Sequence, residues 1–125
     1  MPATLAARLE KEETLHIIRE IERSPEMSQR ELSIRLGISV GKINFLMNAL
    51  IDKGFVKVEN FRKSDNKIAY LYNLTPRGIE EKARMTYLFF KRKTAEYEQL
   101  AQDIRQLQAE VQQAGAPARE QAIRD

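Results

Sequence analysis

The sequence contains no cysteine and a single histidine, His16, among its 125 residues. Without cysteine the chain can form no disulfide, no thiolate nucleophile and no cysteine-based zinc finger, and one histidine excludes a multi-histidine metal site. His16 lies in an apolar helical pattern, which favours a packing or surface role over catalysis. No phosphate-binding glycine loop or nucleophile elbow occurs either. We therefore expect no enzymatic activity, metal or cofactor.

Long apolar runs are also missing. No stretch approaches the roughly 20 apolar residues that a membrane span needs, and the first residues lack the charged, apolar and small regions of a signal peptide. These absences favour a soluble cytoplasmic protein that does not bind membranes. A chain of 125 residues has room for one core domain and a short appendage.

The segment from Ser28 to Val56 has the pattern of a helix-turn-helix followed by a strand. Its apolar residues are spaced as two crossing helices require, with Gly37 at the turn. These positions are Leu32, Leu36, Ile38, Ile43 and Leu46. An ordinary helical hairpin is the alternative interpretation.

The helix ends in this segment carry their own signals. Ser28 and Glu31 form an S-x-x-E capping box, in which each residue can satisfy a free amide of the other. Ser39 can cap the second helix. Gly37 can end the first helix in the left-handed conformation, because it has no β-carbon. The local chemistry therefore agrees with the apolar pattern.

A further helix is predicted before this segment, since Leu15, Ile18 and Ile21 recur at helical spacing and Ser24-Pro25 would end it. We expect its apolar face to complete a three-helix core. Residues 4–11 are expected to form an additional turn or a short separate helix.

After the second helix of the pair, the apolar period changes to two. Val56 and Val58 alternate with charged residues, and residues 69–74 form a second apolar and aromatic run. Asp65-Asn66 is a plausible turn pair between the two runs. This pattern predicts a β-hairpin, or wing, whose basic tip can enter a minor groove or contact phosphate. A solvated hairpin tip is the alternative.

Charge is distributed unevenly along the chain. From Ser28 to Gly78 there are nine basic and four acidic residues, whereas residues 1–27 and 98–125 each carry a net charge of −2. A basic middle suits a DNA-contacting domain, because neutralised phosphates release counterions.

The second helix of the pair would be the recognition helix. At 100° per residue its apolar residues face the core and its polar residues face outward. The inward set is Val40, Ile43, Leu46, Met47, Leu50 and Ile51, and the outward set is Gly41, Lys42, Phe45, Asn48 and Asp52, with Asn44 at the margin. Asparagine suits adenine edges, lysine suits guanine or phosphate, and an aromatic ring suits the thymine methyl. Gly41 would permit close approach, whereas Phe45 could instead pack beneath the wing.

The predicted DNA-binding residues come from both helices of the pair and from the wing. They are Ser28, Gln29, Arg30, Ser39, Gly41, Lys42, Asn44, Phe45, Asn48, Arg62, Lys63 and Lys67.

Thr75-Pro76 predicts the start of a long helix, with threonine as the cap and proline at the first helical position. No proline or glycine interrupts residues 79–114, where a heptad pattern runs with Lys93 as its one break. The predicted dimerisation residues are Phe90, Tyr97, Leu100, Ile104, Leu107 and Val111. Branched residues at one seam position and leucine at the other favour two parallel strands. A single amphipathic helix packed against the domain is the alternative.

The sequence therefore predicts a mainly α fold with a small β-hairpin wing: a winged helix-turn-helix at residues 12–78, a long dimerisation helix at 79–114 and a flexible tail at 115–125. Its expected function is sequence-specific binding of double-stranded DNA as a homodimer at an inverted repeat. The alternative is a winged-helix module that binds another protein. The sequence does not indicate a small-molecule effector.

Residues 15–97 also resemble a known family. The segments VENFRKSDNK and LTPRGIEEK are similar to those of MarR-type bacterial transcription regulators, especially the subgroup associated with exopolysaccharide genes. This resemblance implies a homodimeric, DNA-binding bacterial regulator of transcription that controls such genes. It implies no ligand.

Overall fold

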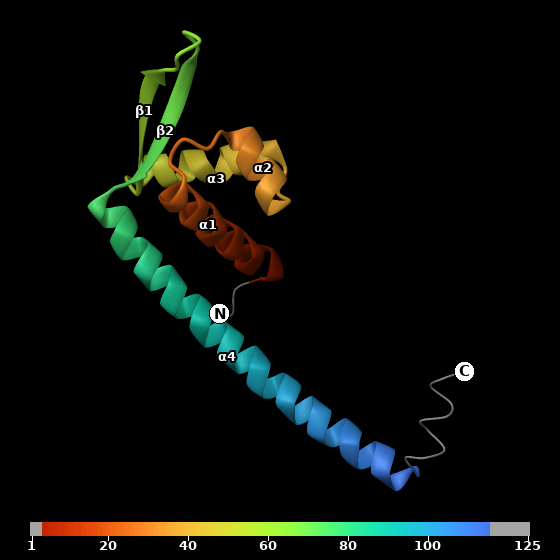
Figure 1. Ribbon diagram of the computed structural model, residues 1–125. Coiled ribbons are helices and arrows are strands. Elements are labelled where there is room, and N and C mark those ends of the chain that lie inside the picture. Colours follow the sequence, from red (N-terminus) through yellow and green to blue (C-terminus); the bar gives the residue numbers. More distant parts are fainter. Residues whose placement is uncertain (1–3, 116–125) are drawn as a thin grey trace. The chain divides into compact units, whose positions relative to one another are not determined.

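The computed structural model describes residues 4–115 and has four helices and one two-stranded sheet in that range (Figure 1). The helices are α1 (Leu5–Arg23), α2 (Gln29–Leu36), α3 (Val40–Asp52) and α4 (Pro76–Gln113), and the strands are β1 (Val56–Arg62) and β2 (Ile68–Leu74). The predicted fold class, a winged helix-turn-helix followed by a long helix, is confirmed. The chain divides into two compact units between Tyr87 and Leu88, which are described separately below.

Helix α1 is longer than the sequence pattern indicated. Thr4 caps it by accepting a hydrogen bond from the Ala7 amide at 3.1 Å. Residues 4–11 therefore form neither a separate turn nor a separate helix, because α1 continues from Leu5 without a break. Leu15, Ile17, Ile18 and Ile21 on this helix are fully or almost fully buried. The predicted apolar face of α1 thus lies in the core.

Helices α2 and α3 form the predicted helix-turn-helix, with axes bent by 115°. Gly37 adopts a φ of 67° between them, in the left-handed region that glycine enters at little cost. Ser39 caps α3 by accepting from the Lys42 amide at 3.1 Å.

The capping box of α2 differs from the expected form in one of its two hydrogen bonds. Ser28 accepts from the Glu31 amide at 3.1 Å, as predicted. The Glu31 carboxylate, however, accepts from the Ser28 hydroxyl at 3.3 Å rather than from the backbone N–H of Ser28. The Ser28 hydroxyl can make both hydrogen bonds, because its oxygen accepts with a lone pair while its proton is donated.

The core lies where α1, α2, α3 and β2 meet. All five predicted helix-turn-helix positions contribute to it, with Leu36 packed at its edge. Val40 does not: it is 46% exposed, although its angle on the helix points inward. Val40 is the first residue of α3, and burial on that face begins only one turn later, at Ile43. The angle sets the direction of a side chain, whereas burial also needs a neighbour to cover it.

The wing is an antiparallel pair in which Val56 lies opposite Leu74 and Arg62 lies opposite Ile68. Asn66 has a φ of 67° at the hairpin tip, which asparagine tolerates better than most residues. The Asp65 carboxylate accepts from the Lys67 amide at 3.2 Å, so the predicted turn pair is confirmed. At the other end of the wing, the Tyr72 amide donates to the Pro25 carbonyl at 3.0 Å. This bond fixes β2 to the segment that follows α1.

The end of the wing leads into α4 through a tight junction. The Thr75 amide donates to the Phe55 carbonyl at 3.0 Å, and the Thr75 hydroxyl donates to the Gly54 carbonyl at 2.6 Å. The same hydroxyl caps α4 by accepting from the Gly78 amide at 3.0 Å. A β-carbon on Gly78 would lie 2.0 Å from the Phe55 carbonyl oxygen, so only glycine fits here.

Helix α4 has 38 residues and a length of about 57 Å at 1.5 Å per residue. In its first part the Arg84 guanidinium donates to Glu81, and this hydrogen bond lowers the pKa of the Glu81 carboxyl. In the second unit the six predicted dimerisation side chains are each between 45% and 72% exposed. Of the tail predicted at 115–125, residues 116–125 lie outside the described residues.

No single helix within residues 4–115 is long and apolar enough to cross a membrane. Only α2 and α3 taken together, as a pair bent by 115°, have the length and the apolar composition of a membrane span.

We expect Gly78→Ala to destabilise the winged unit by about 1–3 kcal/mol through overpacking. The matched control is Gly41→Ala, where an added β-carbon meets no atom within 4 Å and helix propensity improves by up to about 1 kcal/mol. Urea unfolding of both variants measures the difference. A Gly78→Ala protein as stable as the Gly41→Ala protein would contradict the tight junction.

Candidate nucleic-acid interface

The outward face of α3 is separate from its core face, as the helical period requires. Ile43 and Met47 are fully buried, whereas Asn44 and Asn48 are exposed and Phe45 is 59% exposed. Phe45 therefore does not pack beneath the wing. The fold does not need these outward side chains for its core, and this leaves them available to a partner.

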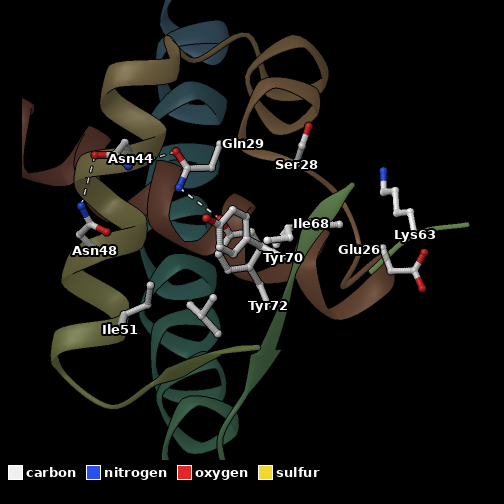
Figure 2. A pocket seen from close by; sticks show the side chains of 12 residues that line it. Glu26, Ser28, Gln29, Asn44, Asn48, Ile51, Lys63, Ile68, Tyr70 and Tyr72 are labelled. Carbon is white, nitrogen blue, oxygen red and sulfur yellow. Dashed lines mark hydrogen bonds between the residues drawn. The ribbon is translucent and has the colours of Figure 1, made fainter. Parts of the chain in front are cut away.

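A groove of about 600 Å³ lies between α3 and the wing, with one wall from each and with Gln29 of α2 between Asn44 and Tyr72 (Figure 2). Asn44, Asn48 and Ile51 of α3 line one side, and Tyr70 and Tyr72 of β2 line the other. Five of the predicted DNA-binding residues line this groove. They are Ser28, Gln29, Asn44, Asn48 and Lys63.

A chain of three hydrogen bonds crosses the groove from α3 to β2 (Figure 2). The Asn48 amide nitrogen donates to Asn44 Oδ1 at 3.2 Å, and the Asn44 amide nitrogen donates to Gln29 Oε1 at 3.2 Å. The Gln29 amide nitrogen then donates to the Tyr72 hydroxyl at 3.3 Å. The two predicted base-reading asparagines are therefore linked to each other and to the wing.

Lys42 also has partners that the sequence did not reveal. Its ammonium lies 3.3 Å from a Glu10 carboxylate oxygen of α1 and 5.7 Å from the centre of the Phe45 ring. Both charged side chains of the ion pair are more than one third exposed, and such pairs stabilise a fold by at most about 1 kcal/mol. A phosphate could therefore replace Glu10 as the partner of Lys42 at little cost.

The basic residues of the wing tip are all exposed. Arg62 donates to the Asn66 side chain at 3.0 Å across the hairpin loop. The Lys63 amide donates to the Lys67 carbonyl at 2.9 Å, which closes the loop and leaves both ammonium groups on the surface. The tip is thus a small cluster of three cations held on a defined turn.

The other predicted DNA-binding residues lie at helix ends. The Ser28 and Ser39 hydroxyls cap α2 and α3, and Arg30 is exposed in the first turn of α2. Gly41 is exposed with open space around it. His16 is exposed on α1, and residues 4–115 contain no group of three or more acidic or histidine side chains that could hold a metal ion.

Three residues of the wing that face the groove were not among the predicted DNA-binding residues. Ile68 and Tyr70 are 60% and 53% exposed, and Tyr72 is buried with its hydroxyl in the hydrogen-bond chain. The available signal was their spacing, since residues two apart on a strand share one face. Alternation in β2 thus places Ile68, Tyr70 and Tyr72 together.

Comparison with known proteins supports the assignment of the fold. Residues 14–57, which run from α1 to the start of β1, match the family model for winged helix-turn-helix DNA-binding domains. The chain contains a winged helix-turn-helix domain. No curated protein sequence matches the chain significantly.

Solved structures of similar fold include regulators of two families. A PadR-like transcriptional regulator from Bacillus cereus is 22% identical with a TM-score of 0.62, and the alignment covers 77% of this chain and 94% of that one. A candidate transcriptional regulator from Thermoplasma acidophilum is 23% identical with a TM-score of 0.60, over 72% of this chain and 92% of that one. A MarR regulator from Methanosarcina mazei is 20% identical with a TM-score of 0.57, over 69% of this chain and 60% of that one.

At these identities the similarity establishes the winged-helix fold. The predicted resemblance to MarR-type proteins is confirmed at the level of the fold. The chain spans less than two thirds of the length of the Methanosarcina regulator.

If the wing tip contacts DNA phosphates, replacing Arg62 and Lys63 by alanine should weaken binding to all duplexes by a similar factor. The plot of log K against log salt concentration should become flatter by about two units, since each phosphate contact contributes about 0.9. Fluorescence anisotropy at several salt concentrations measures this slope. Lys57→Ala combined with Arg84→Ala removes the same charge at positions away from the wing tip and should leave the slope nearly unchanged. A slope that the Arg62 and Lys63 variant does not alter would place the wing tip outside the interface.

Proposed function

We propose that this protein is a sequence-specific DNA-binding regulator of transcription that acts as a homodimer on an inverted-repeat operator. The observation that carries this proposal is the outward face of α3, where Asn44, Phe45 and Asn48 are exposed although the adjacent residues are buried. A helix of this kind fits the major groove, where asparagine can bond adenine through two hydrogen bonds.

The groove and the wing also support a DNA-binding function. A winged helix that places α3 in the major groove would set its wing tip near an adjacent phosphate backbone or minor groove. Lys63 lines the groove, and Arg62 and Lys67 lie exposed at the tip. Cations placed there supply affinity that depends on salt but not on sequence.

The dimer is proposed from the second unit. Leu100, Ile104 and Leu107 of α4 are 57%, 47% and 58% exposed, which is unusual for apolar side chains that recur at heptad spacing. A second copy of α4 in parallel would cover them. Two recognition helices related by a twofold axis would then meet half-sites whose centres lie about one helical turn, or a multiple of it, apart.

Further details of the proposal come from the sequence alone. The similarity of VENFRKSDNK and LTPRGIEEK to the exopolysaccharide-associated MarR subgroup suggests control of such genes in a bacterial cytoplasm. Genome-wide mapping of bound sites tests this part independently of DNA binding itself.

A winged-helix module that binds another protein is the second candidate. The observation that favours it is the exposure of three large apolar side chains, Phe45, Ile68 and Tyr70, on the recognition helix and the wing. Exposed apolar surface of this kind is typical of protein interfaces.

A salt titration with duplex DNA distinguishes the two candidates. Selection of bound fragments from a random duplex library supplies the operator, and the affinity for it is then measured from low to high salt. A steep loss of affinity with salt and an enriched palindrome support DNA binding. Binding that is weak, indifferent to salt and without sequence preference would instead favour the protein-binding module.

The proposed dimer leads to a test on α4. Leu100→Asp with Leu107→Asp should separate the copies, because each buried leucine contributes about 1.5–3 kcal/mol and the aspartates would face each other. Sedimentation should report a monomer whose winged unit remains folded. Gel shifts should show a large loss of affinity for an inverted repeat.

The matched control is Gln102→Asp with Ala109→Asp, two exposed positions seven residues apart and off the seam. This variant adds the same charge and should stay dimeric. A seam variant that remains dimeric would place the interface elsewhere, and a monomer with undiminished operator affinity would contradict the need for a dimer.

A further inference from the structure

The hydrogen-bond chain from Asn48 to Tyr72 uses the four side chains unequally. Asn44 accepts at Oδ1 from Asn48 and donates through Nδ2 to Gln29, so both ends of its amide are engaged. The Asn48 side chain donates one proton to Asn44 and makes no other hydrogen bond within residues 4–115. Its Oδ1 and second N–H are therefore free on the exposed face of α3.

The opposite end of the chain is fixed. Tyr72 is only 6% exposed, and its own amide is bonded to the Pro25 carbonyl. Gln29 is the first residue of α2, next to the Ser28 cap, and it reaches both Tyr72 and Asn44. The hydroxyl of a tyrosine whose ring is largely buried on β2 thus anchors a row of amides that ends at the surface of α3 (Figure 2).

We propose that Asn48 alone reads an adenine edge, that Asn44 and Gln29 are positioning residues, and that the Tyr72 hydroxyl is their anchor. This inference rests on the proposed DNA-binding function and refines it. Adenine needs one acceptor and one donor from the amide, at its N6 and N7 atoms. Asn48 offers both from an amide that is bonded through one N–H only, whereas the Asn44 amide is bonded to a neighbouring side chain at both its oxygen and its nitrogen, which fixes its orientation within the chain of bonds.

The physical advantage is preorganisation. An exposed asparagine amide rotates freely and must be ordered when it binds a base, which reduces the net gain from its hydrogen bonds. Here Tyr72 and Gln29 orient the Asn44 amide through successive hydrogen bonds. Asn44 in turn orients Asn48 by accepting a hydrogen bond from its amide nitrogen. Removing any supporting link should therefore reduce discrimination at the base pair that Asn48 reads, and at no other.

The inference can be tested first without DNA. Side-chain amide signals of Asn44 and Asn48 in two-dimensional ¹H–¹⁵N NMR should shift and exchange faster in Gln29→Ala and Tyr72→Phe than in the unmodified protein. Tyr72→Phe keeps the buried ring and removes only the hydroxyl. The matched control is Tyr70→Phe, which removes a hydroxyl from the same face of β2 but outside the chain of bonds. Unchanged Asn44 and Asn48 signals in both test variants would overturn the proposed linkage.

The second test measures sequence preference by selection from a random duplex library followed by titration. Asn48→Ala should reduce discrimination at one base pair per half-site by about 5- to 150-fold, the range for a bidentate contact. Gln29→Ala and Tyr72→Phe should reduce it at that same base pair by a smaller factor. The double variant Gln29→Ala with Asn48→Ala should lose no more discrimination than Asn48→Ala alone, because the two act on one contact. Tyr70→Phe should retain the discrimination.

Several results would overturn the inference. If Gln29→Ala weakened all duplexes equally, Gln29 would contact phosphate, and if it altered a different base pair, Gln29 would read that base itself. Additive losses in the double variant would show that Gln29 and Asn48 act independently. An unmodified protein that binds no duplex would refute the proposed function and the reading role together, whereas the NMR measurement would still report whether the side chains are linked.

Discussion

The structure depends on the burial of one face of α3. Ile43, Met47 and Leu50 are removed from water among residues of α1, α2 and the wing, and each such side chain contributes about 1.5–3 kcal/mol relative to exposure. A helix turns by 100° per residue, so fixing these three positions also fixes the direction of Asn44 and Asn48. The core therefore sets the outward face, although no outward residue belongs to the core.

Features that depend on short stretches of chain were predictable from the sequence. The caps at Ser28 and Ser39, the turn at Gly37 and the hairpin loop at Asn66 each follow from residues a few positions apart. Val40 was misplaced because a periodic pattern carries no information about where the covering elements end. The start of α1 was missed because residues 4–11 contain only two large apolar side chains, Leu5 and Leu9, and the Thr4 cap marks the true beginning.

Contacts between distant residues could not be predicted in this way. Gln29 and Tyr72 are 43 positions apart, and Lys42 and Glu10 are 32 apart. Each residue looks like an ordinary surface side chain in its own segment, and the pairing arises only when the core brings α1, α2 and β2 beside α3. The sequence thus indicated which side chains face outward, but not which of them are already hydrogen-bonded to one another.

Strand β2 connects the two proposed modes of DNA recognition. Its first residue, Ile68, follows the basic hairpin tip, and four residues later the Tyr72 hydroxyl supports the row of amides. Exposed cations at the tip act through charge, which salt screens, whereas the amides act through directional hydrogen bonds, which salt affects little. The Tyr72 amide is also bonded to the Pro25 carbonyl, so the backbone of β2 is held at the residue whose hydroxyl bonds Gln29. Nonspecific affinity and sequence reading can therefore share one strand and still respond differently to ionic strength.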